Sequence, residues 1–272
     1  MPPEFKQSPS YGDHIMSVLN SVQKKALALN QDDRIYGTFA EIGAGQEVAR
    51  HFFQVGLASQ TVAKTISAYD MTFSDSIYGK SSRYVSEDRV KQMLVYEFDL
   101  LTSRLSDNKG KESRFFSFAD TVATSSRGGK IPHGWMGVRF QVEPGGEPND
   151  IIIHVKIKDK QRLQQQEALG ILGVNLVHAA YFNLNSTDEL MESLFDNLNS
   201  ARVEIDILRL EGPFFKGTNN QLVAVKLVEK GFSQAALIDP DGQVLQVTDC
   251  FCLLYTSPSP RDLSTSRMPS SA

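Results

Sequence analysis

The residues best suited to chemistry surround a short glycine turn, Gly43-Ala44-Gly45, which follows an apolar run and precedes an amphipathic one. Glycine adopts positive φ angles easily and lets a ligand approach the backbone closely. A helix that begins directly after such a turn points free N–H groups at an anion. We therefore expect the phosphate of a nucleotide to bind at Gly43, Gly45 and Gln46.

Further polar residues follow where a nucleotide needs them. Asp70 ends a second expected strand, 61–70, at about the separation at which dinucleotide-binding folds place an acid for the ribose hydroxyls. Asp75 lies in the polar segment 71–82, which we expect to be a loop at the ligand edge of the sheet. Arg127 and Lys130 flank two glycines in SSRGGKIPH, a composition suited to wrapping a phosphate.

The glycine turn permits three functions. The first is a soluble nucleotide-binding protein, with nucleotidyl or phosphoryl transfer as its chemistry and an ATP- or NAD-type ligand. The second is a protein that binds S-adenosylmethionine, because Glu41-Ile-Gly-Ala-Gly also resembles the first motif of class I methyltransferases. The third is a non-catalytic binding or scaffold module, because Val48 replaces the third glycine of the dinucleotide fingerprint. No motif identifies a catalytic residue or a metal site.

The elements that must position these residues alternate between strand and helix patterns. Apolar and β-branched residues at 35–42, a helical spacing at 47–55 and the run 61–70 predict a Rossmann-like β-α-β unit. A helix follows Ser86, and strands are expected at 114–123, 134–142 and 151–158, joined by short loops that favour antiparallel pairing. The fold class is therefore α/β, with a mixed, partly antiparallel sheet and flanking helices.

Two sets of charged residues in the second half of the chain indicate strand faces that are exposed to solvent. His154, Lys156 and Lys158 alternate along one strand, and Glu204 and Asp206 alternate along another. Alternation of polar and apolar residues predicts a wet face without further assumptions.

Composition indicates an ordinary globular protein. The chain has 272 residues, 41% of them hydrophobic and 22% charged, with a net charge of −4. The negative charge gives no support to nucleic-acid binding. No apolar run is long enough for a membrane helix and the first residues contain no apolar signal core, so we expect a cytoplasmic protein without a membrane partner. We expect residues 1–13 to be disordered and 14–250 to form one domain.

Two resemblances extend this interpretation. Residues 252–272, CLLYTSPSPRDLSTSRMPSSA, resemble a translated sequencing adapter, so we expect 251–272 to be a non-native, disordered tail. The runs FAEIGAGQEVARHFFQVG, QQQEALGILGVNL and VEIDILRLEGPFF resemble an uncharacterised bacterial family over about 33–246, which implies a longer natural protein. Its members carry the labels nicotinate- or nicotinamide-nucleotide adenylyltransferase and TonB-dependent receptor. The first is compatible with a nucleotide site, but Gly43-Ala-Gly-Gln46 replaces the expected His-x-Gly-His, so no catalytic residue carries over.

Overall fold

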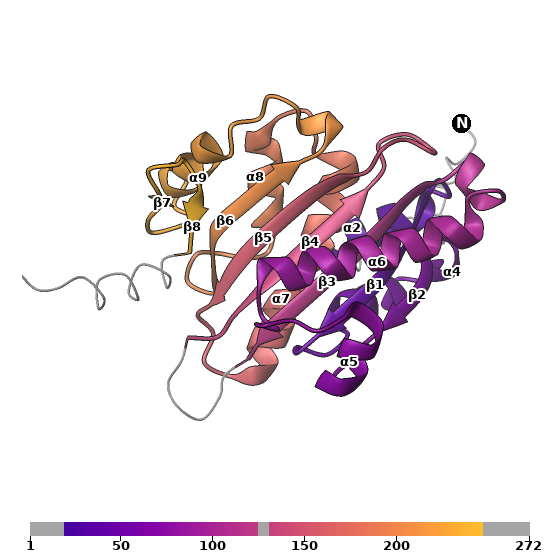
Figure 1. The fold of residues 1–272 in the computed structure, drawn as a ribbon, viewed down its shortest axis with the longest axis horizontal. Coiled ribbons are helices and arrows are strands. Elements are labelled where there is room, and N and C mark those ends of the chain that lie inside the picture. The colour runs from indigo at the N-terminus through magenta and orange to yellow at the C-terminus, as the bar shows by residue number, and fades with distance from the viewer. Residues whose placement is uncertain (1–18, 125–130, 247–272) are drawn as a thin grey trace, which may run out of the picture.

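A six-stranded mixed sheet with helices on both faces forms the centre of the protein (Figure 1). The computed structural model describes residues 19–124 and 131–246. Within these residues the strand order is β2-β1-β3-β4-β5-β6, and a separate two-stranded hairpin follows. The predicted α/β class is confirmed, including the β-α-β start and the antiparallel second half.

The strands of the large sheet are β1 (Ile35–Ile42), β2 (Val62–Ile66), β3 (Arg114–Ala123), β4 (His133–Phe140), β5 (Asn149–Ile157) and β6 (Val203–Glu211), and the hairpin is β7 (Leu237–Ile238) and β8 (Val244–Leu245). The helices are α2 (Ser21–Gln31), α3 (Glu47–Gln54), α4 (Ala58–Thr61), α5 (Met71–Tyr78), α6 (Glu87–Leu105), α7 (Arg162–Phe182), α8 (Thr187–Leu194) and α9 (Asn220–Glu229), with 3-10 turns η1 (Lys109–Lys111) and η2 (Pro213–Phe215).

The direction of the chain across the sheet reverses at β1. This strand pairs in parallel with β2 on one side and with β3 on the other. The chain passes from β1 through α3 to β2, and then returns through α5 and α6 to β3. The remaining pairs, from β3 to β6, are antiparallel. The carboxyl ends of β1, β2 and β3 therefore meet at one edge, beside a reversal of the strand order.

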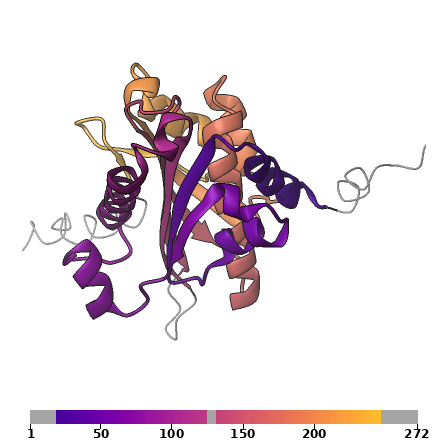
Figure 2. The ribbon, with the colours of Figure 1, turned by 90° about the vertical axis from the view of Figure 1, so that its right-hand side faces the viewer.

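The helices divide into two layers (Figure 2). The dark magenta helix α6 lies on one face of the sheet, and the salmon α7 lies with the indigo α2 on the other. The larger core is on the α7 face, where aromatic side chains of β1, α3 and β3 meet: Phe39, Phe52, Phe116 and Phe118. The ring centroids of these pairs with Phe39 are 4.9 to 5.8 Å apart, within the range of favourable aromatic contacts.

The segment 61–82 differs from the sequence prediction. The expected strand 61–70 is shorter, because β2 ends at Ile66. The expected loop 71–82 is mostly helix α5, which begins after Asp70. The Asp70 carboxylate accepts a hydrogen bond from the Phe73 N–H, a standard helix N-cap that starts the helix locally. The helix expected after Ser86 is α6, and the Ser86 side chain caps it by accepting from the Arg89 N–H.

Two further expectations fall outside the described part of the chain: the disordered residues 1–13 and the adapter-like tail 251–272. No helix within 19–124 and 131–246 combines the length and the apolar character that crossing a membrane would require.

Candidate ligand-binding site

A cavity of about 320 Å³ opens at the carboxyl ends of β1, β2 and β3. Open α/β sheets bind ligands at this edge, where the strand order reverses, and the volume falls within the range of small-molecule sites. We call it the switch-point pocket. Its lining combines apolar residues, a backbone turn and hydroxyl groups: Ile42, Gly43, Ala68, Tyr69, Met71, Ser74, Tyr84, Val85, Thr121, Val122, Ala123 and Thr124.

The two glycines of the predicted phosphate turn have different surroundings. Gly43 lines the pocket and has a φ of 103°, and a Cβ there would lie 1.9 Å from the Val122 carbonyl oxygen. Glycine at this position therefore lets the turn pack on the backbone of β3. Gly45 has a φ of 87°, and its nearest neighbours are Gln166 of α7 and Glu47. Only the first of the two glycines contributes to the pocket lining.

The expectation that the start of α3 has free N–H groups is wrong for two of them. The Glu41 carboxylate, at the end of β1, accepts hydrogen bonds from the N–H groups of Val48 at 2.9 Å and Ala49 at 3.0 Å. An internal carboxylate thus occupies the place that a phosphate would take at a helix N-terminus. Gln46, also predicted to contact the ligand, donates from Nε2 to Thr65 Oγ1 on β2 at 3.0 Å.

A second buried acid stands beside Glu41. Asp120 of β3 is its register partner, and both residues are 1% exposed. Burial raises the pKa of Glu41 to about 7, against the effect of its backbone hydrogen bonds. Burial, and then the neighbouring Glu41 carboxylate, also raises the pKa of Asp120 well above its usual value. The pair therefore binds a proton close to neutral pH, as adjacent buried carboxyl groups do.

The two predicted acids of segment 70–75 serve the structure of α5. Asp70 is exposed and caps the helix, while its sequence neighbours Tyr69 and Met71 line the pocket. Both oxygens of Asp75 accept from the hydroxyl of Tyr84, at 2.9 and 3.0 Å. Tyr84 is itself a lining residue, so Asp75 lies just behind the pocket wall.

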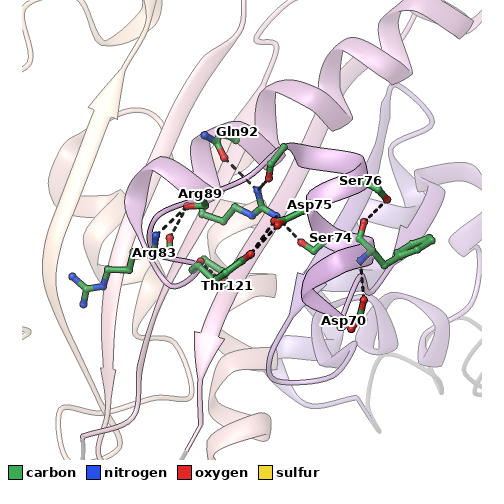
Figure 3. A network of polar contacts seen from close by, with 12 residues as sticks. Asp70, Ser74, Asp75, Ser76, Arg83, Arg89, Gln92 and Thr121 are labelled. Atoms are coloured by element: carbon green, nitrogen blue, oxygen red, sulfur yellow. Dashed lines mark hydrogen bonds and ion pairs between the residues drawn. The ribbon is translucent and has the colours of Figure 1, made fainter.

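Arg89 of α6 is the centre of this wall and was missed by sequence reasoning (Figure 3). It is 1% exposed, and its guanidinium donates to Ser74 Oγ and to the Gly79 carbonyl, each at 2.6 Å. It also lies 3.7 Å from the Asp75 carboxylate, which balances its charge. These bonds fix α5 on α6 and hold the pocket wall in place. A single arginine within an amphipathic helix gave no signal of this role.

The predicted basic residues Arg127 and Lys130 lie outside the described residues. Thr124, the last described residue before them, lines the switch-point pocket. Their predicted role in holding a phosphate therefore stays a prediction.

The two strand faces predicted to be solvated are instead partly buried and paired with each other. His154 and Asp206 are 1% and 3% exposed. Lys156 lies 3.0 Å from Asp206 and 3.1 Å from Glu204, and Lys158 lies 2.9 Å from Glu204. The prediction failed because β5 and β6 are adjacent, so that their charges neutralise each other. Opposite charges at matching spacing on the two strands were the sequence signal from which this pairing could have been predicted. No cluster of His, Cys, Asp or Glu within 19–124 and 131–246 is arranged to hold a metal ion.

The sequence matches no known protein-family profile and no curated protein sequence. Neither label of the resembling family therefore has support from a sequence match. Among solved structures, the chain is similar to the competence/damage inducible protein CihA from Agrobacterium tumefaciens, with 17% identity, a TM-score of 0.44, and coverage of 59% of this chain and 96% of that one. A competence-damaged protein (CinA) superfamily protein from Enterobacter cloacae gives 12% identity, a TM-score of 0.43, and coverage of 66% and 98%. Function is therefore inferred below from this chain's own residues.

Proposed function

We propose that the chain binds a nucleotide-like small molecule in the switch-point pocket. The observation that supports this most directly is the position of the pocket, at the carboxyl ends of three parallel strands where the strand order reverses. Tyr69, at its mouth, is 68% exposed, and an exposed aromatic ring offers a stacking surface to a base. The hydroxyl group of Thr124 suits the polar part of such a ligand, whereas that of Thr121 already donates to the Tyr84 carbonyl at 2.7 Å.

The phosphate contacts differ from the sequence expectation. The Glu41 carboxylate already accepts from two N–H groups at the start of α3, so we assign the phosphate to Arg127 and Lys130. Nucleotidyl or phosphoryl transfer, which depends mainly on positioning and positive charge, would require these two residues.

A second candidate ligand is S-adenosylmethionine. The buried pair Glu41 and Asp120 lies next to the glycine turn and gains negative charge as the pH rises above neutral, which then favours a cationic ligand over an anionic one. This ligand has no need of Arg127 and Lys130. Binding without chemistry, as in a scaffold module, is the third alternative.

The test is a thermal-shift screen of the full chain against ATP, NAD, nicotinamide mononucleotide and S-adenosylmethionine. A ligand at a hundred times its Kd stabilises the folded state by about 2.7 kcal/mol, which raises the Tm of a chain of this size by about 5 to 10 °C. A cooperative melt without a shift for any of the four would refute nucleotide binding and favour the scaffold.

Two sets of variants locate the site. Tyr69→Ala should weaken binding about tenfold or more, because stacking on one base contributes about 1 to 3 kcal/mol. Phe73→Ala is the matched control, since this residue is also exposed on α5 but does not line the pocket. Loss of the shift in the double variant Arg127→Ala, Lys130→Ala would identify a phosphate ligand, whereas a retained shift with S-adenosylmethionine would identify the second candidate.

A further inference from the structure

A second cavity, of about 170 Å³, lies between helix α6 and the strands β1 and β2. It is on the face of the sheet that α6 covers (Figure 2), and its lining residues come from 36–38, 63–64 and 97–105. Within the described chain it shares no lining residue with the switch-point pocket. A cavity of this volume holds a ligand of about six to eight non-hydrogen atoms. We call it the α6 cavity.

The wall of the α6 cavity contains a buried hydroxyl group without a partner. Thr38 of β1 is 3% exposed, and its Oγ1 forms no hydrogen bond with any residue in 19–124 or 131–246. Buried side-chain hydroxyls nearly always have a partner, because burial removes their hydrogen bonds to water. An unpaired hydroxyl on a cavity wall therefore indicates a partner that enters the cavity.

A buried acid lines the same cavity. Glu97 of α6 is 0% exposed, its Oε1 accepts from the Tyr78 hydroxyl at 2.7 Å, and its Oε2 lies 2.5 Å from Lys64 Nζ. These contacts fasten α5 and β2 to α6, so they have a structural role that leaves Thr38 out. The two oxygens of a carboxylate offer about four acceptor positions, so Glu97 can accept a further bond from a ligand.

The two buried groups select a neutral hydroxyl on the ligand. Thr38 is the register partner of Lys64 in the parallel pair β1–β2, so Lys64 stands beside both Thr38 and Glu97. A ligand hydroxyl can accept from Thr38 and donate to Glu97. An ammonium group only donates, and the charge of Lys64 would repel it. A carboxylate only accepts, and the charge of Glu97 would repel it.

The rest of the lining suits a short apolar body with an anionic end. Leu100, Leu101 and Leu105 of α6 supply apolar surface. Arg104 is exposed, and none of the residues that the structure describes pairs with its guanidinium. Two positive side chains, Arg104 and Lys64, thus line the cavity against one negative side chain. A guanidinium binds a carboxylate through two parallel hydrogen bonds, which makes a carboxylate the best anionic partner.

We propose that the α6 cavity binds a short-chain hydroxy acid. Its hydroxyl lies between Thr38 and Glu97, its carbon chain lies along the leucines of α6, and its carboxylate pairs with Arg104. The proposal concerns a site separate from the switch-point pocket and does not depend on nucleotide binding there.

The first test compares small acids on the full wild-type chain. Ligand-observed NMR titrations with 2-, 3- and 4-hydroxybutanoate should give, for at least one isomer, a Kd on the order of 1 mM or tighter, as a ligand of this size allows. Butanoate, which lacks the hydroxyl, and the matching aminobutanoate should each bind about tenfold more weakly, because a buried polar group stays unpaired. The matching butanediol lacks the carboxylate and should also bind more weakly.

The second test locates the bound acid with two variants. Thr38→Val keeps the shape of the side chain and should weaken the hydroxybutanoate about tenfold, while the Kd of butanoate stays the same. Thr102→Val is the matched control, because the Thr102 hydroxyl bonds to its own helix and does not line the cavity. Arg104→Gln should weaken both acids two- to fivefold but leave the butanediol unchanged, whereas Arg50→Gln, at an exposed position on α3, should change none of them.

Three results would overturn the proposal. Failure of all three hydroxybutanoates to bind would mean that the cavity holds water only. Equal or tighter binding of butanoate or aminobutanoate would show that the buried groups do not select a hydroxyl, and this comparison needs no variant. Binding that is unchanged in Thr38→Val would place the acid elsewhere on the chain. None of these results bears on the nucleotide screen, so the two proposals fail separately.

Discussion

Replacing Glu41 by glutamine should flatten the dependence of folding free energy on pH. Burial raises the pKa of Glu41 from 4.5 to about 7. The folded chain therefore binds this proton more tightly than the unfolded chain does. The resulting stability is fully present below pH 4.5 and is lost as the pH rises through 7.

The size of the effect follows from the two pKa values of Glu41. Each pKa unit corresponds to about 1.4 kcal/mol, so integration from pH 4.5 to pH 8 gives a loss of about 3 kcal/mol in the wild type. The raised pKa of Asp120 adds to the loss in the same direction. Glutamine cannot titrate and keeps one oxygen for the N–H groups of Val48 and Ala49. Its cost in hydrogen bonding is the same at both pH values and cancels in the difference.

Urea unfolding at pH 4.5 and pH 8, followed by the fluorescence of the chain's one tryptophan, Trp135, measures this difference. We expect the wild type to lose about 3 kcal/mol more than Glu41→Gln between the two pH values. Glu229→Gln, at an exposed position, is the control and should behave as the wild type. If Glu41→Gln and the wild type change by the same amount within about 1 kcal/mol, the assignment of a buried, protonated Glu41 is wrong.

Two further substitutions test the packing around the site and the core. Gly43→Ala should lower the free energy of unfolding by about 3 to 5 kcal/mol, because the alanine would need a positive φ and its Cβ would clash with β3. Gly145 has a φ of 69° and open space around it, so Gly145→Ala should lower the free energy of unfolding by only about 1 to 2 kcal/mol. The same urea assay measures both. Equal costs would show that β3 does not crowd the turn. Asn175→Ala should cost about 2 to 4 kcal/mol, because its side chain bonds the Leu194 and Asp196 carbonyls and accepts from Lys25 in the interior. A loss below about 1 kcal/mol would contradict this role.

The regular elements were predictable where local pattern and tertiary burial agree. Strand β1 spans the predicted residues 35–42, and strand β3 spans the predicted residues 114–123. The segment 61–82 was predicted as a strand at 61–70 followed by a loop, whereas the Asp70 cap and Gly79 define a short helix within the expected loop. The polar composition of 71–82 suggested a loop, but the capping signal at Asp70 could have been read from the sequence.

The position of the candidate site was predictable, but most of its contacts were not. A β-α-β start places the ligand edge beside Gly43, and the pocket is found there. The sequence alone could not show that Glu41 reaches back to α3, since this depends on a side-chain direction at the end of β1. The His154–Asp206 contact required the register between β5 and β6, two strands that α7 and α8 separate along the chain.

The central position of β1 also affects how the protein can acquire its structure during synthesis. Ile35 pairs with Arg114, on the far side of β2, α5 and α6 in the sequence. At translation rates of about 5 to 20 residues per second, β1 emerges from the ribosome on the order of ten seconds before β3 can pair with it. During that interval an apolar strand has only β2 as a partner, and non-local parallel pairing of this kind is intrinsically slow. The early part of the chain is thus the segment for which a chaperone would matter most.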